Sequence, residues 1–121
     1  MINYLDKKII NIIFCLLSIT IQFSFSQDGK FDFNKKNVLI VYGGYPPHQP
    51  KTFAKKIEKW LLENNAIVTL SGSTEVYANN KIMDKTDLIV QSVTMLDIKR
   101  NELKGLVRAI SKGTGLAGFH G

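Results

Sequence analysis

The apolar residues of the chain alternate between short continuous runs and longer segments with a helical repeat. Residues 38–42 are aliphatic or aromatic throughout and are followed by two glycines, which is typical of a central strand covered on both faces. Residues 66–70 and 87–93 have a similar character, and residues 115–120 form a run with small side chains. This pattern predicts four strands.

Two segments between these strands have the apolar spacing of an amphipathic helix. In residues 51–64 apolar positions recur at i, i+4, i+7 and i+8, so we expect Phe53 and Trp60 to be buried against the sheet. Prolines interrupt the preceding loop, and Pro50 suits the first turn of this helix.

The second helical segment starts its apolar set at Leu103 and follows the spacing i, i+3, i+4, i+7. We expect Asp97 to cap its start and Gly113 to end it in a left-handed conformation. The connector at residues 71–85 is polar, and only residues 80–83 resemble a short helical turn.

Strands that alternate with helices in this way favour parallel crossover connections. The sequence therefore predicts the α/β class, with an open parallel sheet of flavodoxin-like type and helices on both faces. We expect residues 37–121 to form a partial domain that is truncated after the fourth strand. The reason is that the sequence ends one residue after His120, while the last strand would still need a covering element.

The first residues have the layout of an export signal. Two lysines precede an apolar run at residues 9–25, whose most apolar part is short for a bilayer span of about 20 residues. Small serines stand at the two positions that favour cleavage before Gln27. We expect a signal peptide at residues 1–26, a linker at residues 27–36, and a secreted or periplasmic protein. A retained anchor is the alternative, and only such an uncleaved segment would then contact a membrane.

Composition and charge narrow the class of protein. Hydrophobic residues make up 45% of the chain and charged residues 21%, which excludes a disordered composition. The only cysteine, Cys15, lies in the expected signal peptide, so the exported part has no disulfide. Of the net charge of +6, the signal peptide carries +1 and the rest +5. Several of the lysines recur at helical spacing, which indicates a solvent-exposed helix face. We therefore expect no nucleic-acid partner.

Candidate site residues follow the strands, because ligands of open parallel sheets bind beyond the carboxyl ends of the strands. Gly44 and Tyr45 follow the first predicted strand and Thr94 follows the third. Gly121 follows the fourth. We expect these four residues to contact a substrate, with the Tyr45 ring facing a sugar.

Both histidines of the chain, His48 and His120, fall on the same predicted edge of the sheet. Imidazole binds zinc and transfers protons near neutral pH, so we expect a shared site in which the two act as acid and base or hold a divalent metal such as zinc. A catalytic zinc site usually has three protein ligands, and a third would come from outside this sequence.

Other motifs give no support to nucleotide or glycosidase chemistry. The glycine pattern at residues 113–118 follows a helix and lies within a strand, the reverse of a dinucleotide-binding turn. A glycosidase needs two carboxylates across one cleft, and Asp87 starts its strand at the opposite edge.

Three stretches, residues 38–44 with His48, residues 87–90 and residues 113–121, together resemble the ThuA-like family. That family is named for trehalose utilisation and has a fold similar to class I glutamine amidotransferases. The resemblance covers roughly the first half of the family domain. Where glutamine amidotransferase-like relatives carry a nucleophilic cysteine, the corresponding turn here looks like Phe119-His120-Gly121.

The resemblance implies a role in carbohydrate metabolism, acting on a disaccharide or keto-sugar as a metal-assisted hydrolase or lyase. It implies His48 and His120 as site residues and a divalent metal as cofactor. Two alternatives stay open: a non-catalytic carbohydrate-binding module, and an inactive fragment. A flavodoxin or receiver domain ranks last, because no hydroxyl-rich phosphate loop follows the first strand.

Overall fold

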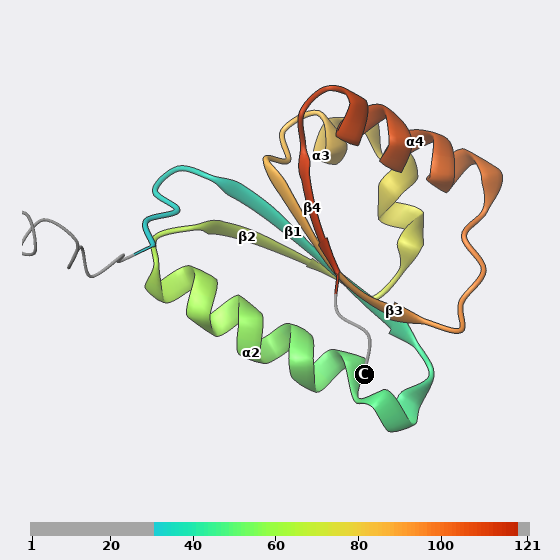
Figure 1. Cartoon of the computed structure of the whole chain (residues 1–121), viewed down its shortest axis with the longest axis horizontal. Coiled ribbons are helices and arrows are strands. Elements are labelled where there is room, and N and C mark those ends of the chain that lie inside the picture. The colour runs from blue at the N-terminus through green and yellow to red at the C-terminus, as the bar shows by residue number, and fades with distance from the viewer. Residues whose placement is uncertain (1–30, 119–121) are drawn as a thin grey trace, which may run out of the picture. The chain divides into compact units, whose positions relative to one another are not determined.

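The computed structural model describes residues 31–118. Its sheet has four strands, all parallel, in the order β2-β1-β3-β4 (Figure 1). The strands are β1 (Asn37–Gly44), β2 (Ile67–Ser71), β3 (Leu88–Thr94) and β4 (Gly115–Gly118). The predicted α/β class with an open parallel sheet is confirmed. The expected signal peptide, His120 and Gly121 lie outside the described residues.

β1 lies inside the sheet, between β2 and β3, and its side chains pack into the cores on both faces. Val38 and Ile40 pack with Ala54 and Leu61 of helix α2 (Pro50–Glu63). Leu39 and Val41 alternate with them and enter the core on the other face, and all four are at most 1% exposed. This explains the continuous apolar run that predicted the strand.

The helices cover the two faces unequally. α2 lies alone on one face within the described residues, and Figure 1 shows the other elements on the opposite face. These are the 3-10 helix η3 (Thr74–Ala78), α3 (Asn80–Met83) and α4 (Arg100–Ser111). Pro50 occupies the first turn of α2 and Gly113 has a φ of 105° after α4, as the sequence predicts. A further 3-10 helix, η2 (Pro46–His48), connects β1 to α2.

The predicted buried faces of the helices are partly wrong. Trp60 is 42% exposed and packs edge-on against Phe31 and Phe33, which precede β1. On α4, Leu106 and Ala109 are buried, whereas three members of the predicted apolar set are exposed: Leu103, Val107 and Ile110. α4 is rotated about its axis relative to the predicted orientation, because η3 approaches its buried Gly105. A Cβ atom at Gly105 would lie 1.8 Å from the carbonyl oxygen of Tyr77.

The polar connector at residues 71–85 contributes more to the core than its sequence predicts. Helix α3 confirms the expected turn, but Tyr77 of η3 is fully buried and donates to Oε1 of Gln91 at 2.7 Å. A single aromatic residue in a polar segment gives no periodic signal, so its burial was not predictable from the sequence. η3 therefore forms part of the layer that covers β1 and β3.

Candidate functional site at the carboxyl edge of the sheet

The direction of the crossovers reverses between β1 and β3. From β1 the chain crosses to β2 at one edge of the sheet, whereas from β3 it crosses to β4 at the opposite edge. Ligands of open α/β sheets bind at the carboxyl edge beside such a reversal. Four predicted site residues lie here: Gly44 at the end of β1, Tyr45 and His48 after it, and Thr94 at the end of β3.

Gly44 and Thr94 bring the two strand ends together. They are register partners in the parallel ladder, and the amide of Tyr45 donates to the carbonyl oxygen of Thr94 at 3.0 Å. Gly44 has a φ of 91°, and a Cβ atom there would lie 1.6 Å from the same carbonyl oxygen. Only glycine fits this position, so its role is to let β1 turn tightly beside β3.

Tyr45 and His48 form an edge-to-face pair above this turn. Their ring centroids are 5.0 Å apart at an interplanar angle of 89°, and the His48 amide donates to the Tyr45 carbonyl oxygen at 3.2 Å. The prolines of η2 restrict the backbone between them. Tyr45 is 43% exposed, so the pair presents an aromatic surface to the solvent.

The end of β3 has an unusual backbone that the sequence did not reveal. Ser92 and Thr94 are buried, but Met95 has a φ of 53° with its side chain 81% exposed. Left-handed conformations of unbranched residues are uncommon and often mark functional sites. Leu96 follows and reaches back toward Gly43 of β1, so the loop after β3 borders the same site.

A buried carboxylate joins the start of α4, which follows β3, to η3. Glu102 in the first turn of α4 is 1% exposed; it accepts from the Thr74 hydroxyl at 2.9 Å and from the Lys99 amide at 3.1 Å. This contact replaces the predicted Asp97 cap, and a lysine at the N-cap gave the sequence analysis no capping signal. Lys99 also donates to Glu75 at 3.1 Å, and this hydrogen bond and charge raise the pKa of the Lys99 ammonium.

The described residues do not make a zinc site by themselves. His48 is the only imidazole among residues 31–118, and no three His, Cys, Asp or Glu side chains in this range gather closely enough to hold a metal. The partner expected for His48 is His120, which lies outside the range.

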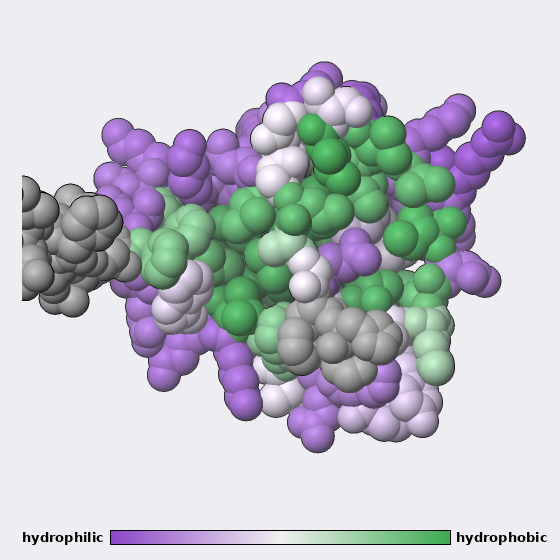
Figure 2. All heavy atoms as spheres, viewed as in Figure 1, coloured by the Kyte–Doolittle hydropathy of each residue, from purple (hydrophilic) through white to green (hydrophobic). Residues whose placement is uncertain are grey.

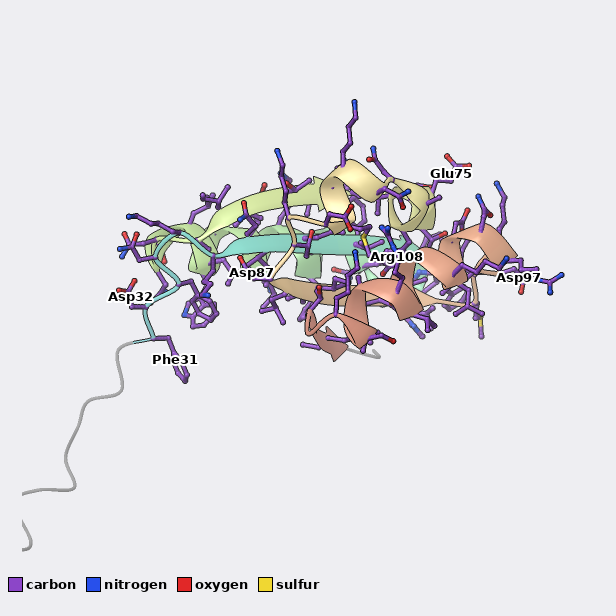
Figure 3. The ribbon with its side chains drawn as sticks, turned by 90° about the horizontal axis from the view of Figure 1, so that it is seen from above. Phe31, Asp32, Glu75, Asp87, Asp97 and Arg108 are labelled. Atoms are coloured by element: carbon purple, nitrogen blue, oxygen red, sulfur yellow. The ribbon has the colours of Figure 1, made fainter. Side chains whose placement is uncertain are left out.

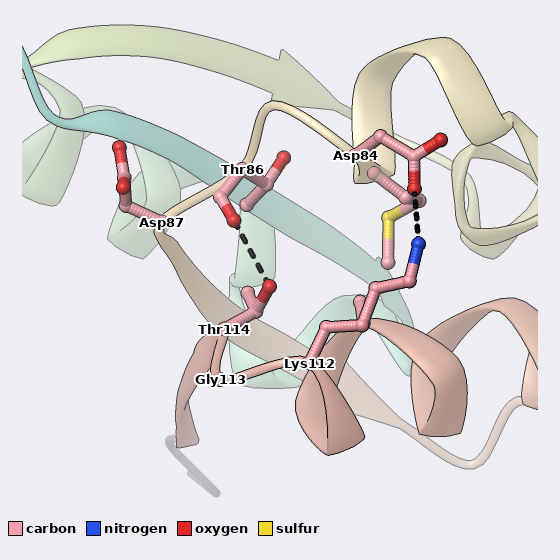
Figure 4. A pocket seen from close by; sticks show the side chains of 8 residues that line it. Asp84, Thr86, Asp87, Lys112, Gly113 and Thr114 are labelled. Atoms are coloured by element: carbon pink, nitrogen blue, oxygen red, sulfur yellow. Dashed lines mark hydrogen bonds and ion pairs between the residues drawn. The ribbon is translucent and has the colours of Figure 1, made fainter.

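A polar pocket of about 270 Å³ lies at the opposite, amino edge of the sheet (Figure 4). Asp84 on its wall is paired with Lys112 at 3.3 Å and Arg108 at 3.2 Å, and the Thr114 hydroxyl donates to the Thr86 carbonyl oxygen. These polar groups join the loop before β3 to the loop before β4. Asp87 accepts from the Asn37 amide at 2.8 Å, which agrees with its predicted place at the edge away from the site.

Comparisons with known proteins found no relative from which a function could be inferred. No family model matches the chain, and no curated protein or solved structure is significantly similar to it. Among the helices of residues 31–118, none is long and apolar enough to cross a membrane.

Proposed function

We propose that this chain is an exported, ThuA-like protein that binds a small carbohydrate at the carboxyl edge between β1 and β3. The observation that supports this proposal is the junction of Gly44 with Thr94, which holds the exposed Tyr45 ring beside His48 at the reversal of the sheet. The predicted signal peptide and the sequence resemblance to the family support the export and the sugar class.

The chemistry of the edge suits a sugar. A sugar ring has an apolar face of C–H groups that packs on an aromatic ring, and hydroxyls that need hydrogen-bond partners. Tyr45 offers the aromatic surface and a phenolic hydroxyl. The imidazole of His48 lies next to it and is able to donate or accept.

Calorimetric titration of the full chain with a disaccharide tests the site. We expect Tyr45→Ala to weaken binding by about tenfold, which corresponds to about 1.4 kcal/mol. Trp60→Ala is the matched control, because Trp60 is equally exposed but lies at the far end of α2, toward the amino edge. No binding by the parent chain, or equal loss in the two variants, would exclude this site.

Catalysis is the second step of the proposal. In a hydrolase or lyase, His48 and His120 would act as acid and base at the substrate, or the two imidazoles would help to hold a divalent metal such as zinc, which would polarise the substrate. A turnover assay beside the titration separates the enzyme from a binding module. In an enzyme, His48→Ala abolishes turnover even at saturating sugar, whereas in a binding module the parent shows no turnover and the variant changes affinity alone.

A further inference from the structure

Helix α2 turns a lysine face away from the sheet. Ala54 and Leu61 point into the core, and the opposite side of the helix presents Lys51, Lys55, Lys56 and Lys59. These lysines border an open groove of about 430 Å³ whose walls are almost entirely carbon, because the aliphatic stems lie along the helix. In Figure 2 the purple side chains along the lower border cover α2.

Part of this charge is available to a partner. Lys55 is paired with Glu58 at 2.7 Å, and the pair of Lys59 with Glu63 is long at 3.9 Å and exposed. Within residues 31–118, no ion pair involves Lys51 or Lys56. Four lysines and two glutamates leave the helix with a charge of +2.

Exposed apolar side chains flank the end of this face. Phe31 is 67% exposed, and its ring packs edge-on against that of Trp60 with the ring centroids 6.1 Å apart. Figure 3 shows Phe31 at the end of the described residues opposite Glu75 and Asp97. Lysines beside Trp and Phe are typical of helices that lie in a membrane interface.

We propose that α2 docks on an anionic bilayer, with its lysines on the lipid headgroups and with the rings of Trp60 and Phe31 entering the interface. Charge complementarity to anionic lipid supports this occupant, and the exposed rings of Trp60 and Phe31 beside the lysines favour a bilayer over an acidic protein.

The single tryptophan of the chain makes the orientation measurable. The full chain is added to phosphatidylcholine vesicles with and without phosphatidylglycerol, with bromine on the acyl chains as a quencher of Trp60 emission. Attachment through residues 9–25 would occur with neutral and anionic vesicles alike, so the difference between the two lipids reports on α2. We expect a blue shift and at least twofold quenching only with the anionic lipid, and reversal at about 0.5 M salt.

Two matched triple variants test which face is responsible. Lys51→Gln, Lys56→Gln and Lys59→Gln together remove three charges from α2, and Lys81→Gln, Lys85→Gln and Lys104→Gln remove three from the other side of the sheet. Both sets lower the net charge from +6 to +3.

We expect the first triple to lower Trp60 quenching at least threefold and the second to leave it near the parent value. Equal loss in both triples would mean general attraction of a basic protein and would overturn the proposal. The proposal would also be overturned if Trp60 emission were not quenched, or if it were quenched in neutral vesicles alone. A change in Trp60 emission on adding RNA, with no change on adding vesicles, would overturn it as well.

Discussion

The carbonyl oxygen of Tyr77 lies where a methyl group on Gly105 would have to stand, at 1.8 Å from an ideal Cβ position. A 3-10 segment and a helix that are 28 residues apart in the sequence therefore touch backbone to backbone. This contact forms the layer over β1 and β3 and sets the rotation of α4.

Gly105→Ala should destabilise the fold in spite of the better helix propensity of alanine. The methyl group must displace the backbone of η3, and we expect a loss of about 3 kcal/mol in the free energy of unfolding. Lys104→Ala, on the exposed neighbour, should change it by less than about 0.5 kcal/mol. Urea unfolding of both variants measures the difference, and a neutral Gly105→Ala would show that η3 yields without cost.

Gly44→Ala and Gly43→Ala form a second matched pair. At Gly43 a Cβ atom meets its nearest neighbours at 3.6 and 3.8 Å, which is ordinary contact, whereas at Gly44 it would overlap the Thr94 carbonyl oxygen. We expect Gly44→Ala to cost at least about 2 kcal/mol and to shift the amide signal of Tyr45 in NMR spectra. Gly43→Ala should stay within about 1 kcal/mol, and similar effects in both would contradict the geometry.

The buried Glu102 should be sensitive to loss of its acceptor oxygen. Glu102→Ala leaves the Thr74 hydroxyl and the Lys99 amide without this acceptor, at an expected cost of about 2 kcal/mol. Glu102→Gln keeps an oxygen and should lose less. Glu63→Ala, an exposed acid with a long ion pair, is the control.

A double-mutant cycle identifies the partner of Glu102. If the hydroxyl of Thr74 is that partner, Thr74→Val should cost less in the Glu102→Ala background than in the parent chain. Strict additivity of the two free-energy changes would mean that the hydrogen bond does not contribute to stability.

Tyr77 should make stability depend on alkaline pH. Burial raises the pKa of the Tyr77 phenol, because the ionised form is desolvated. The unfolded phenol ionises first, so the stability that Tyr77 contributes is complete below about pH 10 and is lost as the pH rises beyond it. We expect this group to lower the free energy of unfolding by about 1.4 kcal/mol per pH unit above that value.

Tyr77→Phe isolates this effect. It removes the ionisation and leaves a constant offset from the lost hydrogen bond to Gln91. Unfolding curves of parent and variant at about pH 9 and about pH 11 should therefore converge with rising pH. Parallel curves would show that Tyr77 reaches solvent before it ionises.

The strands were predictable because their signal is local. Val38 to Val41 are apolar on both sides, and only a doubly covered strand explains that pattern. The face of α4 was not predictable from its spacing. Leu103 fits the helical repeat as well as Leu106, and the choice between them depends on the approach of η3 to Gly105, which the sequence of α4 does not encode.

The candidate site was predictable in part for the same reason. Gly44 and Thr94 end their strands and Tyr45 follows the first, so the rule for parallel sheets predicted their position at the carboxyl edge. The left-handed Met95 and the buried Glu102 depend on contacts between segments distant in sequence, and neither residue type signals such a role.

Strand β4 has all four residues exposed, and the exposed apolar side chains of α4 lie on the same face of the molecule in Figure 2. Within residues 31–118, β4 is an edge strand, and an edge strand with open hydrogen-bonding groups next to exposed apolar side chains can pair with a strand of another molecule. The purified chain should therefore self-associate, to an extent that rises steeply with its concentration. Light scattering across a dilution series belongs before any binding assay, since a self-associated sample would bury the surfaces under test.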